Sequence, residues 1–194
     1  MKKILITGGA GFIGSNLALK LLKKGYQVRV LDSLSPQIHG LNPEKSSPLY
    51  NSIKNKVEFI LGDVTDKTVL EKAIQNQDAI IHLAAETGTG QSMYEIKKYC
   101  DVNVGGTALL LDILANQSHA IQKLIVASSR AIYGEGKYRC SEHGIVYPEA
   151  RKDIDMQQGD FECKCPLCKK PIAFLPTDEE SKIQFNSVDL NIGD

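Results

Sequence analysis

Residues 3–14, KILITGGAGFIG, constrain the fold of this 194-residue chain more than any other stretch. Residues 4–6 are apolar, three spaced glycines follow, and a helical pattern covers residues 16–24. This order predicts a strand, a tight turn and a helix. In such a unit Gly8 permits the sharp turn, Gly11 lets the backbone approach a ligand, and Gly14 lets the helix pack on the strand. The helix N-terminus offers free N–H groups and a partial positive charge to an anion.

An acidic residue follows this unit at a characteristic distance. Residues 26–31 read as a second strand, and Asp32 stands at its end. A carboxylate there accepts hydrogen bonds from the ribose hydroxyls of NAD and repels the additional phosphate of NADP. The plainer alternative is a glycine-rich turn followed by a solvated aspartate. Because the strand, turn, helix and acid occur together, we favour an NAD-binding turn.

Composition and charge narrow the range of partners. The chain has 23 Lys and Arg against 23 Asp and Glu, which gives no net attraction to nucleic acid or to an acidic membrane. Its start does not resemble a signal peptide, and no apolar run approaches the length of a membrane span. We expect a cytoplasmic protein with one core and a small extra segment, and with no nucleic-acid or membrane partner.

The polar stretch 33–56 contains three prolines and reads as a loop, with a short helix near residues 49–53. It is long for a connection in a compact α/β unit, which indicates an excursion that faces a ligand.

A third strand is predicted at residues 57–61, followed by Asp63 and Val64. These two residues stand where a strand end can flank an adenine ring, with the acid accepting a hydrogen bond from the exocyclic amine. Alternatively, Thr65 or Asp66 simply caps the helix predicted next. The two interpretations are compatible.

A fourth strand, residues 79–83, leads into Ala84 and Ala85, which are small enough for a cofactor to lie against the backbone. We interpret His82 as a packed strand residue rather than a catalyst. Residues 86–91 form a Gly/Thr loop at the carboxyl end of this strand, where open parallel sheets bind ligands.

The remaining pattern completes the fold class. Residues 94–114, which include Asn103, read as a long helical region, and residues 121–127 read as a fifth strand. Repeated alternation of strand and helix predicts an α/β fold with a doubly wound parallel sheet and right-handed crossovers. We expect an NAD-binding domain over residues 1–134 and a second segment over residues 135–194.

Six motifs occur in the order typical of the extended short-chain dehydrogenase/reductase family: TGGAGFIG at 7–14, Asp32, GDV at 62–64, HLAA at 82–85, NVGGT at 103–107 and SSRAIYG at 128–134. The chain most resembles the NAD-dependent sugar-nucleotide epimerase/dehydratase branch, which implies a Rossmann-like domain and a nucleotide-sugar substrate. The resemblance implies cofactor-binding roles for Gly8, Gly11, Phe12, Ile13, Gly14, Asp32, Asp63, Val64, Leu83, Ala84, Ala85 and Asn103.

The resemblance also implies a catalytic role for Ser129, whose hydroxyl would hydrogen-bond the sugar oxygen that is oxidised. The family's base is a Tyr on a later helix with a Lys four residues on, where the ammonium lowers the pKa of the phenol.

This pair is not found. Tyr residues are followed at that spacing by a basic residue in Tyr94–Lys98, Tyr133–Lys137 and Tyr147–Arg151. The first pair precedes the serine strand, glycines interrupt the second, and the third carries arginine after a proline. We therefore expect the chain to stop before the catalytic helix and to be inactive alone.

A cysteine-rich insertion follows the serine motif. Cys140 with His143, and Cys165 with Cys168, are two pairs with two-residue gaps, which is metal-ligand spacing. Two such pairs complete a tetrahedral shell, so the spacing predicts a structural zinc. Cys163 is an alternative ligand, and ordinary reduced cysteines in a loop are the plainer reading. A similar insertion occurs, by resemblance, in a subset of sugar-nucleotide 4-epimerases.

We therefore expect an NAD-dependent sugar-nucleotide epimerase, of which this chain is the cofactor-binding part. A dehydratase or reductase, and a non-catalytic NAD-binding module with a zinc knuckle, remain as alternatives. By resemblance, residues 94–114 are a candidate pairing helix for a homodimer.

Overall fold

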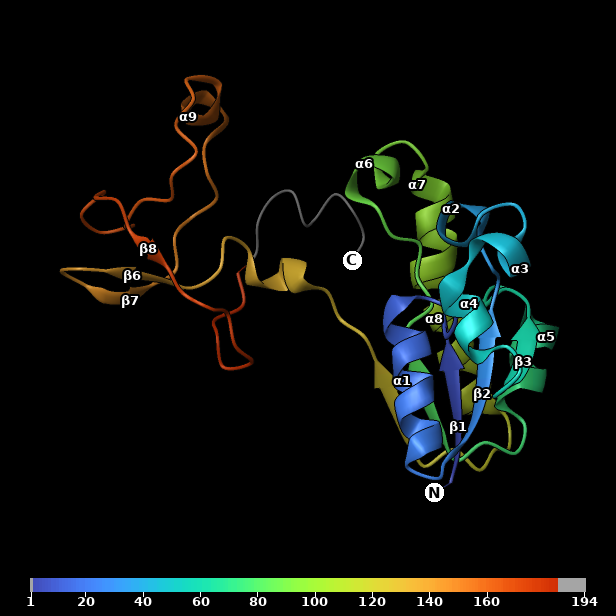
Figure 1. Ribbon diagram of the computed structural model, residues 1–194. Coiled ribbons are helices and arrows are strands. Elements are labelled where there is room, and N and C mark those ends of the chain that lie inside the picture. Colours follow the sequence, from blue (N-terminus) through green and yellow to red (C-terminus); the bar gives the residue numbers. More distant parts are fainter. Residues whose placement is uncertain (1, 185–194) are drawn as a thin grey trace. The chain divides into compact units, whose positions relative to one another are not determined.

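The computed structural model describes residues 2–184 and divides them into two compact units, residues 2–127 and 128–184 (Figure 1). The predicted boundary after residue 134 stays a prediction, and residues 185–194 of the predicted second segment lie outside the described residues. No helix in the described range is long and apolar enough to cross a bilayer.

The first unit is built on a five-stranded parallel sheet. Its strands are β1 (Lys3–Thr7), β2 (Gln27–Asp32), β3 (Glu58–Leu61), β4 (Ala79–His82) and β5 (Lys123–Val126), in the spatial order β3-β2-β1-β4-β5. The chain runs outward from β1 to β3 and then returns to β4 on the other side of β1. This reversal opens a crevice at the carboxyl ends of β1 and β4. The predicted Rossmann-like α/β fold is confirmed.

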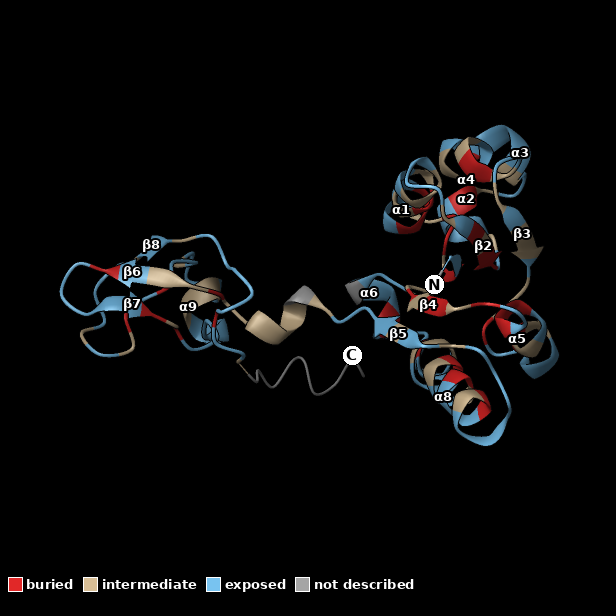
Figure 2. Cartoon of the chain, turned by 90° about the horizontal axis from the view of Figure 1, so that it is seen from below, coloured by how far each residue is buried: buried red, intermediate tan, exposed pale blue. Residues whose placement is uncertain are grey.

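Helices cover both faces of this sheet (Figure 2). Alternate strand residues point to opposite faces, so Ile4 and Ile6 pack under α1 (Phe12–Lys23) and α4 (Pro48–Ile53). On the other face Leu5 and Ile80 pack under α5 (Lys67–Ile74) and α8 (Thr107–Asn116). These two apolar layers fix the strand ends that carry the site.

Two connections differ from the sequence expectation. The stretch predicted as a loop with one short helix contains three helices: α2 (Pro36–His39), α3 (Pro43–Ser46) and α4. Each begins with a proline, whose fixed φ suits the first helical position.

The helical region predicted at 94–114 is instead divided into a short helix, α7 (Ile96–Tyr99), a π-helix, η1 (Cys100–Gly106), and α8. A further short helix, α6 (Thr89–Ser92), occupies part of the stretch that was predicted as a loop at 86–91. A π-helical turn inserts an extra residue per turn and so re-aims the side chains within it.

The second unit is small. It contains a 3-10 turn, η2 (Arg130–Tyr133), a helix, α9 (Asp153–Gln157), and an antiparallel sheet of β6 (Tyr138–Cys140), β7 (Gly144–Val146) and β8 (Ala173–Phe174) in the order β7-β6-β8. Its buried cluster consists of Cys140, Val146 and Cys165. So small a cluster contributes little hydrophobic stabilisation, and small units of this kind are commonly stabilised by a bound metal ion.

Asp66 caps α5, because its Oδ1 accepts hydrogen bonds from the backbone N–H groups of Thr68 (2.9 Å) and Val69 (3.1 Å). We expect Asp66→Ala to lower the free energy of unfolding by about 1 kcal/mol, measured by denaturant titration. Thr65→Ala is the matched control, since Thr65 bonds only Asp63 and should change stability by less than about 0.5 kcal/mol. An equal loss in both variants would contradict the assignment of the cap.

Candidate functional site

A cavity of about 440 Å³ lies at the carboxyl edge of the parallel sheet. Of the twelve residues predicted to bind the cofactor, eleven line it: Gly8, Gly11, Phe12, Ile13, Gly14, Asp32, Asp63, Val64, Leu83, Ala84 and Ala85. They come from the ends of β1, β2, β3 and β4 and from the start of α1. The fold thus gathers four separate sequence motifs around one cavity.

The three spaced glycines serve different purposes in the turn. Gly8 has a φ of +66°, and a Cβ on it would lie 2.7 Å from the backbone nitrogen of Ala84. A Cβ on Gly14 would lie 2.5 Å from the carbonyl oxygen of Gly8. A Cβ on Gly11 would meet only that same oxygen, at 3.4 Å. Packing within the protein therefore requires Gly8 and Gly14, while Gly11 leaves open the approach from the cavity.

The N-terminus of α1 faces this cavity without a cap. Gly11 is the N-cap residue, no side chain accepts a hydrogen bond from the first turn, and that turn contains no acidic residue. Phe12 and Ile13 are 75% and 66% exposed at the cavity wall. Unpaired N–H groups together with the helix dipole make this end suited to an anion such as a phosphate.

Asp32 is held firmly in the wall. Its Oδ2 accepts a hydrogen bond from the N–H of Ala10 at 2.8 Å, and its Oδ1 accepts one from the N–H of Leu34 at 2.9 Å. The residue is 9% exposed. A carboxylate has about four acceptor positions, so acceptors remain for two hydroxyl groups of a ligand.

Asn103 does not line the cavity but supports it. Its Oδ1 accepts a hydrogen bond from the N–H of Glu86 at 2.8 Å, and its Nδ2 donates to the carbonyl of Glu86 at 3.2 Å. The π-helix η1 carries this side chain, and Glu86 belongs to the cavity wall. Asn103 therefore fixes the backbone of the loop that follows β4.

His82 is buried between two threonines. Its Nδ1 lies 2.8 Å from Oγ1 of Thr7, and its Nε2 lies 3.1 Å from Oγ1 of Thr107. Burial lowers the pKa of this imidazole, which favours the neutral ring. These contacts agree with a packed strand residue.

Several cavity residues were not predicted. They are chiefly Ser35, Gln37, Ile38 and His39, from the stretch after β2, and Glu86 and Thr87, from the loop after β4. Two features of the sequence could have indicated them: the unusual length of the stretch after β2, and the position of the loop after β4 at the carboxyl end of a strand.

The predicted catalytic residue Ser129 belongs to the second unit. It is the N-cap of η2, and its Oγ accepts a hydrogen bond from the N–H of Ala131 at 3.1 Å. Its catalytic role stays a prediction.

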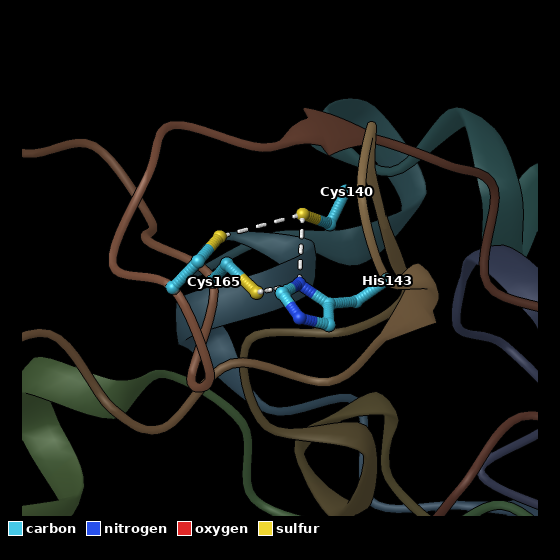
Figure 3. Close-up of side chains that lie close together, drawn as sticks. Cys140, His143 and Cys165 are labelled. Atoms are coloured by element: carbon cyan, nitrogen blue, oxygen red, sulfur yellow. Dashed lines mark hydrogen bonds between the residues drawn. The ribbon is translucent and has the colours of Figure 1, made fainter.

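The cysteine and histidine pairs meet in the second unit (Figure 3). The four ligand atoms of Cys140, His143, Cys165 and Cys168 all lie within 4.8 Å of one another. Sγ of Cys140 is 3.5 Å from Nδ1 of His143 and 3.7 Å from Sγ of Cys168, and Sγ of Cys165 is 3.7 Å from Nδ1 of His143.

Two further observations concern the chemistry of these thiols. The backbone N–H of Glu142 and the ring of His143 lower the pKa of the Cys140 thiol, which favours the thiolate. The alternative ligand Cys163 stands apart from the group, with its Sγ 3.7 Å from Oε2 of Glu135.

Known proteins share the fold and the motifs. The family model described as "NAD dependent epimerase/dehydratase family" matches residues 4–149. A dTDP-L-rhamnose 4-epimerase of Burkholderia thailandensis is 40% identical over 164 residues, which cover 82% of this chain and 44% of that protein. A UDP-glucose 4-epimerase of Neisseria meningitidis serogroup C is 36% identical over 163 residues, which cover 82% of this chain and 43% of that protein.

A crystal structure of UDP-glucose 4-epimerase from Brucella ovis in complex with NAD superposes with a TM-score of 0.54 at 35% identity, covering 69% of this chain and 38% of that one. The chain spans less than half the length of these relatives. The match to the family nevertheless extends over most of the chain. The chain therefore belongs to the NAD-dependent epimerase/dehydratase family.

Proposed function

We propose that this chain is the cofactor-binding part of an NAD-dependent sugar-nucleotide 4-epimerase. The observation that carries the proposal is the cavity beside the uncapped start of α1, with a fixed carboxylate in its wall. The relatives named dTDP-L-rhamnose 4-epimerase and UDP-glucose 4-epimerase support the reaction type, and the NAD-bound structure from Brucella ovis supports the cofactor.

Different residues of the cavity would bind different groups of the dinucleotide. The N–H of Gly11 already donates to the carbonyl oxygen of Gly8 at 3.2 Å, so the backbone N–H groups of Phe12 and Ile13 would bind the pyrophosphate. Asp32 would accept hydrogen bonds from the ribose hydroxyls. Asp63 would accept one from the adenine amine, while Val64 packs beside the ring. Leu83, Ala84 and Ala85 would lie along the cofactor, on a loop that Asn103 holds in place.

NAD, when bound, supplies a reversible hydride acceptor for a sugar carbon. Ser129 would donate a hydrogen bond to the sugar oxygen at that carbon and orient it. The proton of the sugar hydroxyl would pass to a Tyr base, which the resemblance to the family implies and which the described residues do not supply, and it would come back from that base in the reverse step. The hydride would return to the opposite face of the sugar and invert the centre, so an epimerase would consume no NAD overall.

Calorimetric titration of the purified chain with NAD and NADP tests the cofactor assignment. We expect NAD to bind and NADP to bind more weakly, because Asp32 repels the 2′-phosphate. We expect Asp32→Ala to weaken NAD binding and to reduce the difference in affinity between NAD and NADP. Absence of NAD binding, or equal affinity for the two dinucleotides, would contradict the proposal.

The reaction is tested on the protein that carries this chain, with dTDP-L-rhamnose and UDP-glucose as candidate substrates. We expect chromatography to detect the 4-epimer of one of them without steady formation of NADH, and Ser129→Ala to slow its formation. Steady NADH release would indicate a dehydrogenase or reductase. Tight NAD binding without turnover of any nucleotide sugar would favour the non-catalytic module.

We also propose a structural zinc at Cys140, His143, Cys165 and Cys168. A tetrahedral zinc with Zn–S bonds of about 2.3 Å and a Zn–N bond of about 2.0–2.1 Å separates its ligand atoms by about 3.5–3.8 Å. The three distances of 3.5–3.7 Å between these ligand atoms support that geometry. Four protein ligands close the coordination shell, so this metal would hold the fold together and take no part in catalysis.

Two further predictions remain. None of the five cysteines, all of which lie in the described range, forms a disulfide, which fits the predicted cytoplasmic location because that compartment is reducing. A homodimer remains a prediction for the helical region 94–114, where Val104 and Leu111 are 55% and 49% exposed.

A further inference from the structure

His39 is a buried titratable residue that the proposed function does not use. It ends α2, it is 3% exposed, and it belongs to the cavity wall. The stretch that carries it is the one whose length indicated a ligand-facing role. Burial of an imidazole in such a stretch calls for polar partners.

Its partners lie on both sides of the ring. Nδ1 is 2.8 Å from Oγ of Ser47, and Nε2 is 3.8 Å from Oδ1 of Asp32. Oγ of Ser47 also accepts a hydrogen bond from the N–H of Tyr50 at 3.2 Å, and it keeps its own hydrogen and a second lone pair for Nδ1. When the hydroxyl donates to Nδ1, the ring hydrogen lies on Nε2, toward the carboxylate.

An aspartate, an imidazole and a serine hydroxyl in a line also occur in hydrolases. Here Ser47 is 3% exposed and its oxygen caps α4, so it lacks the access to a substrate that a nucleophile needs. The group at the other end of the imidazole is the carboxylate of Asp32, which the proposed function assigns to the ribose.

The ring of His39 lies 3.8 Å from Oδ1 of Asp32 and is itself 3% exposed, so it would keep water from that side of the carboxylate. Backbone N–H groups of Ala10 and Leu34 take one position on each oxygen of Asp32, and the imidazole covers the side toward Ser47. Repulsion between this charge and a ligand phosphate weakens as the local dielectric rises. Water admitted behind Asp32 would therefore weaken the rejection of a phosphorylated ribose.

A hydrogen bond also joins α2 to the loop that follows β4. Nε2 of Gln37 donates a hydrogen bond to the carbonyl of Thr87 at 3.2 Å, and Thr87 follows β4. His39 therefore anchors α2 on the β2 side, while Gln37 joins it to the β4 side of the cavity.

We propose that His39 is a positioning residue that sets the preference for NAD over NADP, by packing α2 behind Asp32 and excluding water from its carboxylate. The inference rests on the proposed NAD binding. It assigns to the stretch after β2 a share in cofactor selection beyond that of Asp32 itself.

Dissociation constants of NAD and NADP, measured by calorimetry on the native chain and on His39→Ala, test this proposal. At a charge separation of about 6 Å, doubling an effective dielectric constant of about 20 lowers the NADP/NAD ratio of dissociation constants by about tenfold. His39→Gln is the matched control, because its amide refills the space and keeps a donor toward Asp32, so its ratio should stay near the native value.

The outcomes separate the two proposals. If the native chain does not bind NAD, the proposed function fails. Suppose instead that the native chain binds NAD, but His39→Ala weakens the binding of NAD and NADP by the same factor and leaves the ratio of their dissociation constants unchanged. His39 is then merely structural and this inference is overturned. Should His39→Ala lack a cooperative melting transition, His39→Asn replaces it, since the shorter amide still reaches Ser47 but uncovers Asp32. An unchanged ratio in that variant overturns the inference equally.

Discussion

Gly14→Ala is expected to destabilise the first unit and to abolish NAD binding. The added Cβ would lie 2.5 Å from the carbonyl oxygen of Gly8 and 2.6 Å from Cα of Gly9. Both contacts are with backbone of the tight turn, so the turn itself must move. We expect a loss of about 2–3 kcal/mol in the free energy of unfolding, measured by denaturant titration.

Gly11→Ala separates binding from folding. Its Cβ would meet only the oxygen of Gly8 at 3.4 Å, so the free chain should keep most of its stability. The methyl group nevertheless occupies the side from which a pyrophosphate approaches. Loss of two charge-assisted hydrogen bonds of about 1.5 kcal/mol each corresponds to about 100-fold weaker NAD binding in calorimetry.

Gly90→Ala is the control for these two variants, because a Cβ at Gly90 meets nothing within 4 Å. It should change neither stability nor affinity appreciably. Native NAD affinity in Gly11→Ala would contradict the placement of the pyrophosphate at the start of α1.

The parallel sheet was predictable because its signals are local. Each signal is contained within a few residues: apolar runs such as Ile4–Ile6, the glycine turn, and the aspartate at the end of β2. Helices α2 and α3 were missed, because four residues are too few to show a helical period. The π-helix was missed because an apolar pattern does not distinguish its hydrogen-bond spacing from that of an α-helix.

The part of the site that local motifs supply was also predictable. The eleven predicted residues in the cavity wall belong to motifs at strand ends, and parallel strands bring those ends to one edge. Gln37 and His39 became visible only in three dimensions. Their partners Thr87 and Asp32 belong to other segments of the site, and a single histidine in a polar stretch gives no sign of which group its ring will face.

Removal of the proposed zinc is expected to unfold the second unit. Its buried cluster is small and contains two of the four predicted ligands, Cys140 and Cys165. Binding of a structural zinc contributes about 10 kcal/mol or more in small zinc modules, so folding of such a unit depends on the metal. We expect one zinc per chain by elemental analysis, and loss of a cooperative melting transition of this unit after chelation or in Cys165→Ser.

Cys163→Ser is the matched control. Cys163 is also buried, yet its sulfur lies beside Glu135 and not among the four ligand atoms. This variant should retain zinc, whereas Cys165→Ser should lose it. Because the described residues that line the cavity all belong to the first unit, NAD affinity should survive both substitutions. Equal zinc loss in the two variants would refute the four-ligand assignment, and an unchanged melting transition in zinc-free protein would refute the structural role of the metal.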